Sequence, residues 1–70
     1  MTVVKVIELV GSSDKGWQEA AENAVAEAEK TLSSLIGVEV ISWTASLNEK
    51  GKIKAYKANV KVAFKVKGSD

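Results

Sequence analysis

The sequence predicts an α+β fold in which four elements follow one another in the order β-α-β-β, within a single domain spanning residues 1–70. Three observations support this prediction. Residues 2–10 and 52–67 are rich in β-branched side chains, as strands are. Residues 15–34 place apolar side chains three or four positions apart, which is the period of an amphipathic helix. Residues 38–47 and 52–67 flank a short turn that contains glycine, so we expect them to pair as a hairpin.

The first predicted strand, Thr2–Val10, is apolar on both faces apart from Lys5 and Glu8. This pattern is typical of a strand that is covered on both sides. The loop formers GSSDKG follow it and provide the start of a helix. We expect Ser13 or Asp14 to cap that helix, and the carboxylate of Asp14 also suits the positive end of the helix dipole.

The predicted helix, residues 15–34, has an apolar stripe made mostly of alanine, which buries little area but allows close approach to a sheet. The stripe consists of Trp17, Ala20, Ala21, Ala24, Ala28, Thr31, Leu32 and Leu35. The solvent side consists of Glu19, Glu22, Asn23, Glu27, Lys30 and Ser34. Gly37 lies just past the helical pattern, and we expect it to help the chain turn into the next strand.

The last predicted strand alternates between two faces. One face consists of Tyr56, Ala58, Val60, Val62, Phe64 and Val66, and the other of Lys57, Asn59, Lys61, Lys65 and Lys67. At about 3.3 Å per residue this strand would extend roughly 50 Å, so we expect it to curl or to extend beyond its own subunit. A right-handed crossover places the first two strands parallel, with the last strand between them and antiparallel to both. One helix then covers one face of a three-stranded sheet, and the other face and both edges stay exposed.

The composition limits the ways in which so small a chain can be stabilised. A single core of this size supplies only ~3–5 kcal/mol of net stability, so small domains usually add disulfides, a structural metal or partner subunits. The chain has no cysteine and no histidine, which excludes disulfides and zinc sites of the Cys/His type. We therefore expect the chain to associate with copies of itself.

The same composition argues against an enzyme. Without histidine or cysteine, a general base and a nucleophile would have to be lysine, serine or a carboxylate, and no pair of these has a recognisable spacing. Lys57 would serve as a Schiff-base lysine only in a desolvated pocket, which the sequence does not indicate. We expect no catalytic residues.

The charged residues are unevenly placed, although the formal net charge is only +1. Seven lysines and no acid lie between Lys50 and Lys67, and a basic stripe of this kind is one form of nucleic-acid interface. The chain has no arginine for forked phosphate contacts, and lysines on an exposed strand commonly protect an edge. We do not expect nucleic acid as a partner, and a basic-faced interaction module is one functional alternative.

The cellular location is expected to be the cytoplasm. No apolar run approaches the ~18–20 residues of a membrane span, and the N-terminal stretch TVVKVIELV is too short and too charged for a signal peptide. No membrane partner is expected.

The chain resembles the dodecin family over nearly its whole length. The resemblance is carried by KVIELVGSS, WQEAAENAVAEAEKTLSSL, VEV at residues 38–40 and YKANVKVAFKV, in this order. It implies a β-α-β-β subunit whose sheet wraps around the helix, assembled with copies of itself into a hollow homododecamer. This assembly agrees with the independent expectation of partner subunits.

The resemblance also implies where a flavin site would lie. Flavin-binding dodecins hold flavins as aromatic-stacked pairs at subunit interfaces, using a tryptophan, an arginine–glycine pair and a glutamine. In this chain those positions are Gly37, Thr44 with Ala45, and Lys57, and all four depart from the pattern. Gly37 has no side chain to stack, and Lys57 only donates hydrogen bonds, whereas an amide both donates and accepts. Binding of riboflavin, FMN or FAD is therefore expected to be weak or absent.

The two tryptophans carry separate expectations. Trp43 lies where the family normally has an aliphatic side chain, and packing in the core or at an interface is the first interpretation. The alternative is that Trp43 is a substitute stacking surface for a flavin in place of Gly37. Trp17, on the first helical turn, is expected to pack in the core or between subunits.

Together these features predict a non-enzymatic, dodecin-like shell for binding or storage of a small ligand. The main alternative is a flavin-free shell that holds calcium or another metal cation. Symmetry axes bring copies of one carboxylate together, and a cation relieves their repulsion. Glu8 and Glu39 are strand carboxylates that could serve in this way, or they are ordinary acids facing solvent or lysine.

Overall fold

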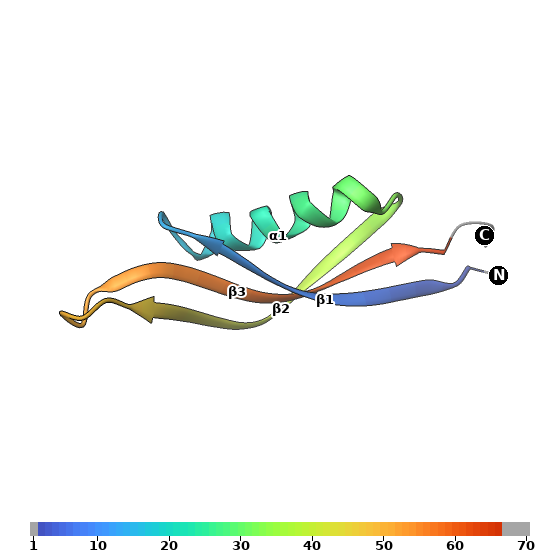
Figure 1. Ribbon diagram of the computed structural model, residues 1–70. Helices are drawn as coiled ribbons and strands as arrows, with labels where there is room; N and C mark the ends of the chain where they lie inside the picture. Colours follow the sequence, from blue (N-terminus) through green and yellow to red (C-terminus); the bar gives the residue numbers. More distant parts are fainter. Residues whose placement is uncertain (1, 67–70) are drawn as a thin grey trace.

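The computed structural model describes residues 2–66. The elements are β1 (Val4–Ser13), α1 (Trp17–Thr31), β2 (Leu35–Leu47) and β3 (Ile53–Lys65). The sheet order is β1-β3-β2, and both outer strands run antiparallel to β3, so the predicted topology is confirmed (Figure 1). The predicted strand end at Lys67 lies outside the described residues.

One helix covers one face of the sheet, which we call the helix face; the opposite one is the outer face (Figure 1). Paired residues of antiparallel strands point to the same face, so the register assigns each side chain to one of the two. The core between α1 and the sheet consists of Ala20, Ala24, Ala28, Ala58, Val60 and Val62. The small alanines bring the helix close to β3, as the sequence predicted.

The close approach requires a glycine in β1. A Cβ atom on Gly11 would lie 1.9 Å from the carbonyl oxygen of Ala20 and 2.8 Å from the Cβ of Ala24. Gly11 pairs with Ala58 inside the sheet, so the prediction that residues 11–13 form a loop is wrong. The strand continues because the missing side chain makes room for the helix.

The helix is shorter at both ends than the predicted range of residues 15–34. Its N-cap is Gly16, which offers no side-chain cap, rather than Ser13 or Asp14. Ser13 still organises this turn, because its Oγ accepts hydrogen bonds from the N–H groups of Lys15 at 2.9 Å and Gly16 at 3.4 Å. The same hydroxyl donates to Glu19 Oε2 at 2.7 Å.

The connection from α1 to β2 turns at Ser34, whose φ is 60°. Gly37 instead lies inside β2, beside an irregularity in the pairing with β3. The prediction that Gly37 forms the turn is therefore wrong, and a serine takes the left-handed conformation in its place.

The β2–β3 hairpin extends past the start of α1 and makes the subunit elongated, with extents of 52 × 19 × 14 Å (Figure 1). Gly51 has φ 77° in the connecting turn, as predicted. Asn48 Oδ1 accepts hydrogen bonds from the N–H groups of Lys50 at 2.9 Å and Lys52 at 3.1 Å. These bonds hold the turn in place.

The outer face has no covering element within residues 2–66. Val4, Val6 and Val10 of β1 are 44%, 55% and 61% exposed. The expectation of a first strand covered on both sides is therefore not met within one subunit. In the same described region, no helix is long and apolar enough to cross a membrane.

Candidate functional site

Three of the four residues at the predicted flavin positions lie on the outer face. Gly37 pairs with Ala63, and Thr44 pairs with Lys57. Ala45 pairs with Tyr56 and therefore lies on the helix face with the buried Ala58. Thr44 and Lys57 are thus cross-strand neighbours, whereas Gly37 is seven positions away along β2, about 23 Å for a regular strand. The two ends of β2 therefore do not form one compact site within a single subunit.

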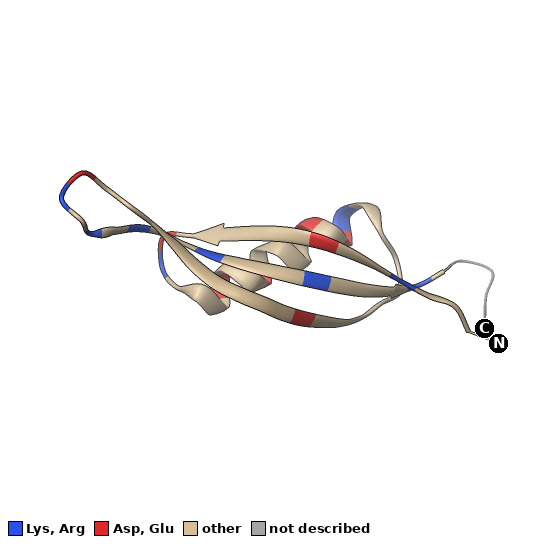
Figure 2. Ribbon diagram, turned by 90° about the horizontal axis from the view of Figure 1, so that it is seen from below, with Lys and Arg blue, Asp and Glu red and all other residues tan. Residues whose placement is uncertain are grey.

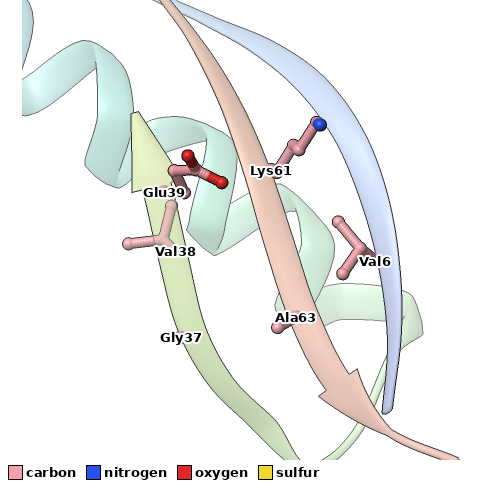
Figure 3. Close-up of a pocket in the computed structure, with 6 residues that line it drawn as sticks. All are labelled: Val6, Gly37, Val38, Glu39, Lys61 and Ala63. Atoms are coloured by element: carbon pink, nitrogen blue, oxygen red, sulfur yellow. The ribbon is translucent and has the colours of Figure 1, made fainter. Parts of the chain in front are cut away.

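Gly37 opens onto a pocket of about 440 Å³ on the outer face. The lining residues are Val6, Gly37, Val38, Glu39, Lys61 and Ala63 (Figure 3). A Cβ atom built on Gly37 meets nothing within 4 Å. The lining contains no aromatic side chain, so the pocket of one subunit offers no ring for stacking.

A charged row crosses the three strands beside this pocket. Lys61 of β3 lies between Glu8 of β1 and Glu39 of β2 in the register. Figure 2 shows the corresponding basic band between two acidic bands, and Figure 3 shows the ammonium of Lys61 directed toward β1. All three side chains are exposed, so the row brings opposite charges to neighbouring positions on the surface of the sheet.

The charged row changes the interpretation of the basic face. Glu8 and Glu39 flank the central lysine, so the outer face carries mixed charge instead of a continuous basic stripe. Most of the lysines in the sheet lie on β3. Its neighbours β1 and β2 contribute acids that are far from these lysines in the sequence. This arrangement argues against a phosphate-tracking surface.

The outer-face carboxylates do not form a metal site in a single subunit. Within residues 2–66, no group of three or more acidic side chains is placed to hold a metal ion. Lys61 separates Glu8 from Glu39, and Asn48 of the loop uses its side-chain oxygen in the turn. Neither Glu8 nor Glu39 therefore has a second carboxylate beside it in the register of one subunit.

Trp43 lies away from the Gly37 pocket. It pairs with the buried Ala58 and is therefore on the helix face, where it is 50% exposed. Gly37 is on the opposite face. Within one subunit the indole of Trp43 does not border the pocket, so stacking by Trp43 would involve a ligand bound on the other side of the sheet or in a neighbouring copy.

Trp17 has a role that the sequence did not indicate. Its Nε1 donates a hydrogen bond to the carbonyl oxygen of Thr44 at 2.8 Å. Its ring meets that of Tyr56 edge-to-face, with centroids 4.7 Å apart and planes at 75°. Trp17 and Thr44 are 27 positions apart in the sequence. Their contact could therefore not be predicted without knowing how the strands pair.

The sequence is similar to that of known proteins over nearly its whole length. The dodecin family model matches residues 3–67. The calcium dodecin of Mycobacterium tuberculosis is 33% identical over 67 residues, which cover 96% of this chain and 93% of that protein. A dodecin of Thermus thermophilus is 38% identical over 64 residues, covering 91% of each.

The fold agrees with a solved structure as well. The crystal structure of the tt0972 protein from Thermus thermophilus superposes with a TM-score of 0.90 at 35% identity, covering 99% of this chain and 100% of that one. Family model, sequence relatives and structure all extend over the complete β-α-β-β unit. The chain belongs to the dodecin family.

Proposed function

We propose that the chain forms a non-enzymatic, cytoplasmic homododecameric shell that binds or stores a small ligand, and that it binds flavins weakly or not at all. The proposal of weak or absent flavin binding rests on the Gly37 pocket. Its lining has no aromatic side chain, whereas the family resemblance implies a stacking tryptophan there. Base-like rings bound on an aromatic side chain gain ~1–3 kcal/mol from stacking. A flavin in this pocket would lose that contribution.

The other departures act in the same direction. Lys57, at the glutamine position, supplies donors but no acceptor for a flavin edge. Thr44 replaces an arginine that would add a cationic, planar contact. Thr44 and Lys57 pair with each other on the outer face, so both departures from the family pattern alter the same surface of the sheet.

Assembly is supported by the surface that a single subunit leaves open. Within residues 2–66, no further strand pairs with the outer edges of β1 and β2, and proteins normally protect such edges. Large apolar side chains are also exposed, more than an isolated small domain usually tolerates. They are Val3, Val4, Val6, Val10, Trp17, Ile36, Val38, Ile41, Trp43, Leu47 and Ile53.

Titration of the purified protein with riboflavin, FMN and FAD, followed by flavin fluorescence, tests the flavin part of the proposal. We expect a signal that does not saturate. Saturable, tight quenching of flavin emission would contradict it. The Trp43→Leu variant tests the alternative that Trp43 is the substitute stacking surface. In that case the native chain binds flavin tightly and this variant does not.

A second candidate function is an ion-holding shell. Two observations favour it: the 33% identity to a protein named calcium dodecin, and the placement of Glu8 and Glu39 on one uncovered face. Calcium titration by calorimetry tests it, with Glu39→Gln expected to abolish the binding heat. Glu27→Gln is the matched control, because Glu27 lies on α1 in an exposed pair with Lys30. Equal binding by all three proteins would exclude Glu39 as a ligand.

A further inference from the structure

Two rows of side chains with different chemistry lie next to each other on the outer face. The first is the charged row described above, and the second crosses the same three strands two positions further along each strand. This second row consists of Val6, Ala63 and Gly37. The Gly37 pocket is lined by residues of both rows (Figure 3). It therefore has a charged half and an apolar half.

The apolar half forms a shallow hollow. Ala63 carries only a methyl group, Gly37 carries no side chain, and a Cβ atom built on Gly37 would meet nothing within 4 Å. Val6 stands at the β1 end of the row and is 55% exposed. A small apolar group can therefore lie on the backbone of Gly37 and the methyl group of Ala63, against the side of Val6.

In the charged half, the carboxylate of Glu39 has no partner among residues 2–66. Figure 3 shows the ammonium of Lys61 directed toward β1, the strand of Glu8, and away from Glu39. In the part of the chain that the structure describes, the single ion pair joins Glu27 to Lys30, and no side-chain hydrogen bond involves Glu39. The charged row also holds two carboxylates against one ammonium. The Glu39 carboxylate is therefore available to a cation that enters the pocket.

We propose that the Gly37 pocket binds a primary amine with an apolar body. The ammonium pairs with Glu39, and the apolar body lies on Gly37 and Ala63. A hydrogen bond between an ammonium and a carboxylate is stronger than one between neutral groups. The pocket volume of about 440 Å³ lies within the range of small-molecule sites. This inference rests on the proposed small-ligand function and names the class of the ligand.

Other classes of ligand match the two halves less well. An anion would approach Lys61, but Glu8 and Glu39 flank that lysine in the register and would repel it. A metal ion needs several oxygen ligands, whereas Glu39 is the single carboxylate among the described residues that line the pocket. A neutral ring system has no ammonium for Glu39. An amine uses both halves of the pocket at once.

Calorimetric titration of the native protein with 2-phenylethylamine tests the proposal. The matched probe is 2-phenylethanol, which has the same ring and chain but a hydroxyl group in place of the ammonium. We expect saturable binding of the amine and about fivefold weaker binding of the alcohol, as for the loss of a well-formed exposed ion pair. Absence of amine binding, or equal binding of the two probes, would overturn the proposal.

Three single variants locate the charge contact. Glu39→Gln should weaken amine binding by about fivefold. Lys61→Gln should tighten it, because this change removes the one ammonium of the charged row. Glu27→Gln is the control and should bind as the native chain does, since Glu27 lies on α1 in an exposed pair with Lys30. An unchanged affinity in Glu39→Gln, or a weaker one in Lys61→Gln, would contradict the assigned contact.

Filling the hollow locates the apolar contact. Ala63→Leu places a larger side chain on the floor of the pocket and should abolish amine binding. Gly37→Leu fills the same hollow from β2, where a Cβ atom has open space, so it provides the test if Ala63→Leu fails to fold. Circular dichroism establishes folding of each variant. Native affinity in a folded variant of either kind would place the amine elsewhere and overturn the proposal.

Sedimentation velocity on the same samples separates this inference from the proposed shell, because one subunit supplies all the residues of the pocket. A monomer that binds the amine in a Glu39-dependent way would contradict the shell and support the pocket assignment. A twelve-subunit species that does not bind the amine would support the shell and overturn the inference drawn here from Glu39.

Discussion

The indole N–H of Trp17 donates a 2.8 Å hydrogen bond to the backbone carbonyl oxygen of Thr44. The first residue of α1 is thereby joined to β2 at the position where the family resemblance implies a flavin-contacting arginine. The edge-to-face contact of the Trp17 ring with Tyr56 adds β3 to the same junction. One side chain therefore connects the helix to both strands of the hairpin.

The Trp17→Phe variant tests this junction. It keeps an aromatic ring near Tyr56 but removes the hydrogen bond to Thr44, so we expect a loss of about 1 kcal/mol in the free energy of unfolding. Trp17→Ala also removes the ring contact, which is worth a further ~0.5–1.5 kcal/mol beyond area. Urea unfolding at a fixed subunit concentration measures both, because oligomer stability depends on concentration. Equal stability of Trp17→Phe and the native chain would show that the bond contributes nothing.

The Gly11→Ala variant tests the close approach of the helix to β1. The new Cβ would overlap the carbonyl oxygen of Ala20, and overpacking of this kind costs roughly 1–3 kcal/mol or more. We expect a large loss of thermal stability or failure to fold. Gly37→Ala is the control, since its Cβ has open space, and it should be neutral or slightly stabilising. Two variants of equal stability would contradict the packing described for Gly11.

The Ser13→Ala variant tests the turn before the helix. It removes an acceptor for two backbone N–H groups and a donor to Glu19, and a hydrogen bond of this kind contributes about 1 kcal/mol to stability. Thermal unfolding should show the loss. The neighbouring Ser12→Ala should have little effect, because Ser12 is exposed and accepts from Asn23 through its backbone oxygen. A larger effect at Ser12 than at Ser13 would reverse the assignment.

The Gly37→Trp variant tests whether the missing ring would account for the weak flavin binding that we propose. The open space at Gly37 admits the indole, and stacking worth ~1–3 kcal/mol should tighten riboflavin binding by about fivefold to 150-fold. Adding Lys57→Gln should strengthen it further by restoring an acceptor. Gly37→Leu controls for added apolar area and should bind more weakly than Gly37→Trp. No gain in either tryptophan variant would show that the weakness has another cause.

The sequence was sufficient for the order of elements, the central position of the last strand and the turn at Gly51. Those features follow from local period and from the handedness of the crossover, both of which are short-range or topological. The buried alanines were also predictable, because Ala20, Ala24 and Ala28 repeat at the helical period.

The element ends and the site geometry were not predictable in the same way. Gly11 reads as a loop residue in isolation, but tertiary packing against α1 places it in a strand. The row of Glu8, Lys61 and Glu39 depends on the register of two strand pairs, which the composition of each strand does not specify. Contacts between residues far apart in the chain need this register before they can be inferred.

Native mass spectrometry of the protein as purified examines the shell and its flavin content at once, because it reports the number of subunits and any bound mass together. We expect a twelve-subunit species without the added mass of a flavin. A monomer would contradict the shell, and a twelve-subunit species carrying flavins would contradict the inference drawn from the pocket at Gly37.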